Sequence, residues 1–252
     1  MDKRLASVTL SKPWLTRCPN YSFSIPERII NICVVKYDVS HFSLDLQLSQ
    51  WLPLQLRQAN HKRQAEFIAG RVAAHYSMNA FDQDQSVEIN PDRSPLFPKA
   101  LKGSISHSRN LAIAATIPSE MIPDTHLGID IQHWFSREET DDVATLVCKD
   151  VEIERLQDTH LSYQQKVTLI FSAKEALYKA IYPQVKEVLN FDVVELIDAK
   201  NHILYFACSG YLIDMGFPQL LECHYQLYNK HIVTLALCGA SNYYDFGAIF
   251  SR

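Results

Sequence analysis

Several common signatures are missing from this chain of 252 residues, and each absence argues against a class of protein. No apolar run reaches the roughly 18 to 20 residues that cross a bilayer, and no apolar secretory core follows Met1–Arg4. The six cysteines form no C-x-x-C pair, so neither a zinc site nor a disulfide framework is indicated. A net charge of −4 argues against bulk binding of nucleic acid. We therefore expect a cytoplasmic protein with no transmembrane segment and no nucleic-acid partner.

The two usual nucleotide-binding loops are also missing. The chain contains neither G-x-x-x-x-G-K-[ST] nor G-x-G-x-x-G, so the common ATP and NAD sites have no support. What is present is an ordinary globular composition, with 47% hydrophobic and 21% charged residues. A chain of this size and composition can bury a sizeable core as one large domain or two small ones.

Two long helical patterns alternate with strand patterns along the chain. The first runs from about 51 to 78 with Pro53 in its first turn, and the second from about 162 to 182, where Pro183 is expected to stop it. Residues 1–31 show little periodicity. Shorter helices are expected at 137–147 and 149–157, and strands at 32–37, 103–117 (a hairpin turning near Asn110), 127–132, 193–197, 202–207, 222–228 and 232–237.

This order predicts an α+β fold, a pseudo-dimer of two similar halves that are each a small antiparallel sheet packed with helices. In both halves a long helix precedes a hairpin, which turns near Asn110 in the first and at Asn229–Lys230 in the second. We place the N-terminal half at residues 1–120 and the C-terminal half at 121–252. The cleft between two such halves is the natural place for a site.

Two carboxylates, Asp130 and Glu175, lie in apolar patterns, where a negative charge needs a positively charged partner. Asp130 lies between two isoleucines in an apolar strand pattern, and a buried charge is costly unless it is paired or bound to a metal. Glu175 lies four residues before Lys179 on a helix, so the two share a face, either as an exposed ion pair or as part of a site. Carboxylates from separate elements are typical of magnesium bound together with phosphate oxygens. Lys179 would then balance the charge on the phosphates.

The first helical pattern is locally basic within an acidic chain. Lys62, Arg63 and Arg71 face few acidic neighbours in sequence, which indicates either a solvated helix face or an anion site. A rigid loop with two prolines follows, and then a strand that carries Ser106 and His107. A histidine at a strand end is often structural, so these residues alone leave the choice open.

Five motifs occur in a fixed order along the chain: Arg63–Arg71, Arg93–Pro98, Gly103–His107, Gly128–Ile131 and Phe171–Lys179. Together they resemble the 4′-phosphopantetheinyl transferases of the surfactin type, over roughly residues 45 to 182. The resemblance implies that the 4′-phosphopantetheine arm of coenzyme A is transferred to a serine of an apo carrier protein, with magnesium in the cleft. It points to peptidyl or aryl carrier domains, to siderophore synthesis and to a monomer.

The resemblance also implies residue roles. Asp130, Gln132 and Glu175 would bind the metal, Glu175 would take the serine proton, and Lys179 would stabilise the charge on the pyrophosphate. The residues expected to bind coenzyme A are Lys62, Arg63, Arg71, Pro95, Phe97, Ser106, His107, Lys174 and Lys179.

One position departs from the family pattern. The family has Asp-x-Glu where this chain has Asp130-Ile131-Gln132, so a neutral amide replaces a charged metal ligand. A catalytically weakened coenzyme A or nucleotide-binding module therefore remains an alternative. A metal-dependent nuclease that uses Asp130 and Glu175 is a further alternative, against which the acidic balance speaks.

Overall fold

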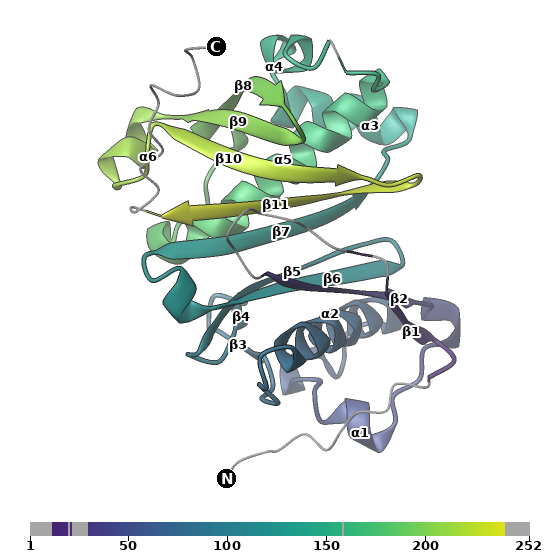
Figure 1. The fold of residues 1–252 in the computed structure, drawn as a ribbon. Helices are drawn as coiled ribbons and strands as arrows, with labels where there is room; N and C mark the ends of the chain where they lie inside the picture. Colours follow the sequence, from purple (N-terminus) through teal and green to yellow (C-terminus); the bar gives the residue numbers. More distant parts are fainter. Residues whose placement is uncertain (1–11, 20, 22–29, 158, 240–252) are drawn as a thin grey trace.

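The computed structural model describes residues 12–19, 21, 30–157 and 159–239, and these residues form two stacked halves (Figure 1). The first half, below in the view, is a sheet with the long helix α2 against its outer face. The second half, above, is a larger sheet backed by the long helix α5. In the described ranges, no helix combines the length and apolar character needed to span a membrane.

The N-terminal half packs α2 (His61–Asn79) on a four-stranded antiparallel sheet. Asn60 caps the helix, because its side chain accepts a hydrogen bond from the backbone N–H of Arg63. Small buried residues such as Ala69 and Ala73 let the helix lie close to the sheet. The strand order is β1 (Leu15–Cys18), β2 (Asn31–Tyr37), β6 (Leu111–Pro118), β5 (Leu101–Ser108); around it lie η1 (Val39–His41), α1 (Leu46–Ser49), η2 (Leu54–Leu56), β3 (Glu88–Ile89) and β4 (Pro95–Leu96).

The C-terminal half packs α5 (Tyr163–Val185) on a five-stranded antiparallel sheet. The approach is closest at Gly128, where an added Cβ would lie 1.9 Å from the backbone oxygen of Ala176, so only glycine fits there. The strand order is β7 (Thr125–His133), β11 (His231–Gly239), β10 (Leu220–Leu227), β9 (Ile203–Cys208), β8 (Val194–Lys200); the shorter elements are η3 (Ser119–Met121), α3 (Arg137–Val147), α4 (Asp150–Glu154), η4 (Phe191–Val193) and α6 (Gly210–Asp214).

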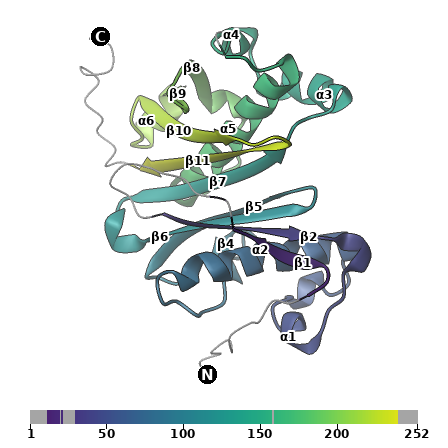
Figure 2. The same ribbon diagram turned by 45° about the vertical axis from the view of Figure 1, so that its right-hand side comes forward.

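The two halves meet along β5 and β7, which lie side by side in both views (Figure 2). Alternate serines of β5 join them: Ser104 Oγ accepts from the N–H of Ile129 at 3.1 Å, and Ser108 Oγ accepts from that of His133 at 3.1 Å. Apolar residues of both sheets form one shared core cluster beside this seam. The predicted α+β pseudo-dimer is therefore confirmed.

Several predicted boundaries were wrong. The first long helix begins at His61 rather than near residue 51, because the preceding residues form a short 3-10 turn and Asn60 then caps α2. Pro183 does not stop α5, which runs to Val185. A proline in the last turn removes one helical hydrogen bond, and the left-handed cap at Lys186 still closes on Tyr182 O. Strand β1 and helix α6 were not foreseen.

Candidate active site at the junction of the halves

Asp130 is the centre of a buried hydrogen-bond cluster where the halves meet. Its Oδ1 accepts from Ser106 Oγ at 2.6 Å and from Lys179 Nζ at 2.7 Å, and its Oδ2 accepts from Ser172 Oγ at 2.8 Å. The residue is only 4% exposed, so these groups replace the water that a carboxylate normally holds. Three elements, β5, β7 and α5, thus converge on one carboxylate.

Lys179 joins the two halves through its ammonium group. Besides Asp130, its Nζ donates to Ser106 Oγ at 2.9 Å and to the backbone oxygen of Ile129 at 3.2 Å. All of these acceptors lie on β5 and β7, although Lys179 itself lies on α5. Ser106 and Lys179, which are both among the residues predicted to bind coenzyme A, are therefore brought together with Asp130.

Glu175 lies one turn before Lys179 on α5 and is half-buried. Burial raises the pKa of its carboxyl group; nearby Lys179 lowers that pKa, and the negative charge of Asp130 raises it further. Among the described residues Glu175 has no hydrogen-bond or ion-pair partner, so its oxygens are open to a ligand. A carboxyl group with a perturbed pKa beside a charged cluster is a common feature of functional sites.

Gln132 lies two residues beyond Asp130 on β7, so both side chains leave the same face of the strand. Its Nε2 donates to the backbone oxygen of His133 at 3.4 Å, and its amide oxygen accepts no hydrogen bond from the described residues. This oxygen is therefore open, as the oxygens of Glu175 are.

The oxygens of Asp130, Gln132 and Glu175 fit magnesium in their chemistry, because Mg²⁺ takes carboxylate and amide oxygens together with water and phosphate. The donor set is nevertheless poor in charge. No group of three or more His, Cys, Asp or Glu residues that could hold a metal ion occurs in the described part of the chain. A cation held here would need further oxygens from a bound molecule.

A cavity of about 720 Å³ lies in the N-terminal half, at the start of α2. It is lined by Arg63, Arg71, Pro95 and His107, which are four of the nine residues predicted to bind coenzyme A. Glu66 and Arg93 also line it, although neither was predicted as a site residue. Arg93 was recognisable in principle, since it is a basic residue inside the quoted two-proline motif.

The electrostatics of this cavity are mixed. Glu66 lies 3.9 Å from Lys62 Nζ and 3.8 Å from Arg63 Nη1, so it partly neutralises the basic helix. Arg71 is 9% exposed, and the central carbon of its guanidinium group lies 4.4 Å from the centre of the Phe67 ring. Burial and, to a lesser extent, the charge of Arg63 lower the pKa of Arg71 to about 10, so this side chain stays charged at neutral pH.

The remaining lining groups carry unused hydrogen-bonding capacity. Arg71 Nε is a buried donor without a partner in the described structure. His107 has an exposed side chain, and partial burial of its ring among the surrounding residues lowers its pKa. A cavity with a fixed guanidinium and an unused N–H is suited to an anion.

Five of the nine predicted residues do not line this cavity. Ser106 and Lys179 belong to the Asp130 cluster, and the other three lie elsewhere. Lys62 is exposed on the first turn of α2, and the Phe97 ring packs on Gly103, where an added Cβ would lie 2.4 Å from it. Lys174 requires a correction. Its buried Nζ lies 2.8 Å from Glu152 Oε1 and donates to the backbone oxygen of Val147 at 2.8 Å. Lys174 is therefore not free to bind a phosphate.

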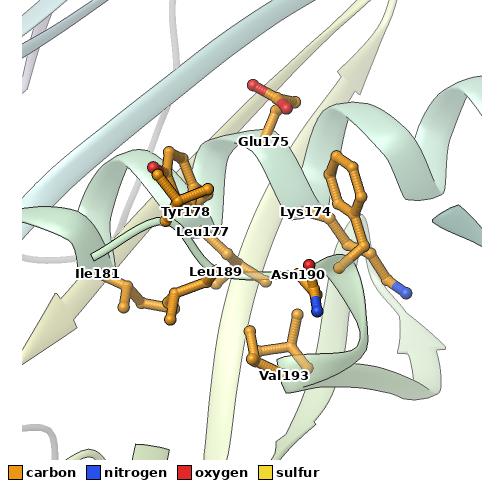
Figure 3. A pocket seen from close by; sticks show the side chains of 11 residues that line it. Lys174, Glu175, Leu177, Tyr178, Ile181, Leu189, Asn190 and Val193 are labelled. Carbon is orange, nitrogen blue, oxygen red and sulfur yellow. The ribbon is translucent and has the colours of Figure 1, made fainter. Parts of the chain in front are cut away.

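A second cavity of about 250 Å³ lies beside α5 and is mostly apolar (Figure 3). Leu177, Leu189 and Val193 are among the residues around it. In the figure the Glu175 carboxylate extends from the upper side of α5, away from Leu189 and Val193 below the helix. Glu175 is one of the residues that line this cavity, and its carboxyl group is near enough to Asp130 for that residue's charge to raise its pKa.

Two family profiles match the chain. Residues 52–117 match the 4'-phosphopantetheinyl transferase N-terminal domain, and residues 126–236 match the 4'-phosphopantetheinyl transferase superfamily. The first range contains the large cavity, and the second contains Asp130, Gln132, Glu175 and Lys179.

Curated relatives are similar over most of their length. Enterobactin synthase component D of Escherichia coli (strain K12) is 37% identical over 207 residues, which cover 80% of this chain and 90% of the relative. The protein of the same name from Escherichia coli O157:H7 is 34% identical over 203 residues, with the same coverage. That from Salmonella typhi is 34% identical over 165 residues, or 65% of this chain and 67% of the relative.

Proposed function

This chain belongs to the 4′-phosphopantetheinyl transferase superfamily, and from that premise we propose how the junction of its halves performs the transfer. The protein moves the 4′-phosphopantetheine arm of coenzyme A to a serine of an apo carrier protein in siderophore synthesis. The observation that carries the mechanism is the convergence of Ser106, Asp130 and Lys179. Glu175, one turn before Lys179, lines the smaller cavity, and His107, next to Ser106, lines the larger one.

Coenzyme A binds across the junction in this proposal. Its nucleotide occupies the large cavity, where Arg63, Arg71 and Arg93 meet the phosphates, and Pro95 forms part of the wall. The pyrophosphate then lies over Lys179 and Ser106. The pantetheine arm extends past Glu175 into the smaller apolar cavity, whose lining suits its methyl and methylene groups.

Asp130, Gln132 and Glu175 hold magnesium in this proposal, and the pyrophosphate supplies further oxygens. When bound, the metal polarises the phosphoryl oxygens as a Lewis acid. Lys179 donates to Asp130 in the free protein, so its ammonium group is already fixed beside the place where phosphate charge develops.

The carrier serine reacts at the phosphorus that bears the pantetheine arm. Glu175, directly or through a water molecule, accepts the hydroxyl proton while the serine oxygen forms a bond to phosphorus. The P–O bond to the second phosphate breaks, and adenosine 3′,5′-bisphosphate leaves with its new charge beside Lys179. The products are the phosphopantetheinylated serine and the bisphosphate.

The decisive experiment incubates the protein with coenzyme A, magnesium and several apo carrier proteins, and records their masses. Addition of the phosphopantetheine arm to one serine is expected. If the protein binds coenzyme A but modifies none of a broad set of peptidyl and aryl carriers, the weakened binding module is the correct reading instead.

Arg63→Ala and Arg71→Ala are expected to raise KM for coenzyme A by about 10-fold or more, with a smaller change in kcat. Contacts to phosphates remote from the reaction are equal in the ground and transition states, and a hydrogen bond to a charged group is worth about 1.5–3 kcal/mol. Steady-state kinetics measure this, with the exposed Arg155→Ala as control. A normal KM together with a lost kcat would remove the phosphate-binding role.

Gln132→Glu is expected to lower the magnesium concentration for half-maximal rate about 10-fold, which corresponds to about 1.4 kcal/mol of binding. The added charge strengthens a donor set that has only two carboxylates, while KM for the carrier protein stays unchanged. Magnesium titrations of the rate test this, with the exposed Gln219→Glu as control. The same half-maximal point for Gln132→Glu and the parent protein would place residue 132 away from the metal.

Three expectations remain predictions. The division of the halves at residue 120 is supported by the two family profiles, because the first profile match ends at residue 117 and the second begins at residue 126. Action in the cytoplasm is consistent with coenzyme A as co-substrate. A monomeric state is consistent with a site whose proposed residues all come from one chain.

A further inference from the structure

The loop before β4 reaches from the large cavity to the end of α5. Asn90, Pro91 and Arg93 of this loop line the cavity in the N-terminal half. Asp92, between them, instead contacts Lys186, which caps α5 in the C-terminal half. The loop therefore links the proposed nucleotide site to the helix that carries Glu175 and Lys179.

Asp92 uses its two carboxylate oxygens for two different tasks. Its Oδ1 accepts from the backbone N–H of Ser94 at 2.9 Å and from Ser94 Oγ at 2.5 Å, which holds the loop in its own turn. Its Oδ2 accepts from Lys186 Nζ at 3.2 Å. One side chain thus fixes the shape of the loop and also its position against α5.

Lys186 is itself held in place. It adopts the left-handed conformation, with φ of 60°, and its N–H closes the last turn of α5 on Tyr182 O at 2.8 Å. Its ammonium group lies 5.1 Å from the centre of the Tyr182 ring. The cation that meets Asp92 therefore has a defined place at the end of the helix.

We propose that Asp92 and Lys186 form a clamp between the halves that positions Arg93 and the loop wall for coenzyme A, which makes both residues positioning residues. This inference rests on the proposed function, because it takes the large cavity as the nucleotide site. Neither residue touches the Asp130 cluster among the described contacts, so the clamp acts on binding of the nucleotide and not on the reacting groups.

The test compares Asp92→Asn, Lys186→Asn and the double variant in KM for coenzyme A, kcat, and Kd for adenosine 3′,5′-bisphosphate. Asn at 92 keeps an oxygen for Ser94 but removes the charge, and Asn at 186 tolerates the left-handed backbone. Lys186→Arg keeps the cation, and the exposed Lys200→Asn is the control.

Each single variant is expected to raise KM for coenzyme A and the Kd about 2- to 5-fold, the range for a partly exposed ion pair. kcat and KM for the carrier stay the same, Lys186→Arg behaves like the parent, and the double variant is no worse than either single one. Unchanged KM and Kd, multiplied effects in the double variant, or a loss of kcat would each overturn the clamp.

The two hypotheses fail in different ways. A parent protein that modifies no carrier contradicts the proposed transfer, yet the Kd for the bisphosphate still tests the clamp. An active parent whose Asp92 and Lys186 variants bind the bisphosphate normally contradicts only the clamp.

Discussion

Glu175→Gln is expected to lower the rate of phosphopantetheine transfer by at least about 10²- to 10⁴-fold, the range for loss of a general base. Glutamine keeps the shape of the side chain, but it removes the proposed proton acceptor and one of two charged metal ligands. Folding should be spared, because burial disfavours the charge of Glu175 and a neutral amide avoids that cost. The measurement is the mass increase of an apo carrier protein with time.

The exposed Glu154→Gln is the control, since it makes the same chemical change on α4. It should transfer the arm at the parent rate. Near-normal turnover by a folded Glu175→Gln protein would remove this residue from the mechanism, and the base would then have to be sought elsewhere in the cleft. A fall in thermal stability matching the fall in rate would instead indicate a structural role.

The central residues of the site could be predicted because each breaks a local pattern. Asp130 is a charge inside an apolar strand, and Glu175 and Lys179 share one face of a largely apolar helix. Their convergence could not be derived from the pattern, because it depends on how β5 of one half meets β7 of the other. The serines of β5 that make this junction have no partners nearby in sequence.

What could not be predicted has a separate physical cause in each case. Lys174 belongs to the same Phe171–Lys179 motif as Glu175, so both were expected in the site. Adjacent residues of a helix point about 100° apart, however, and Lys174 therefore faces α4 while Glu175 faces the cleft. The start of α2 was placed too early because the apolar pattern continues upstream, where the backbone forms separate turns. Asp92 and Lys186 are 94 residues apart, and no local signal pairs them.

Lys174→Met is expected to lower the free energy of unfolding by about 3–5 kcal/mol, the cost of leaving a buried charge without its partner. Lys174 and Glu152 are 3% and 0% exposed, and Glu152 also accepts from the N–H groups of Lys149 and Leu196. The whole free energy of unfolding of a native protein is only about 5–15 kcal/mol, so this loss is a large share of it. Urea unfolding measures it.

The matched control is Lys149→Met, which breaks a Lys–Glu pair whose side chains are 52% and 38% exposed. An exposed pair is worth less than about 1 kcal/mol, so this control separates burial from charge pairing. In the double variant Lys174→Met with Glu152→Gln, part of the loss should return, because no charge is then left buried. Equal losses for Lys174→Met and Lys149→Met would mean that the Lys174 ammonium group reaches water. The residue would then again be available to bind a coenzyme A phosphate.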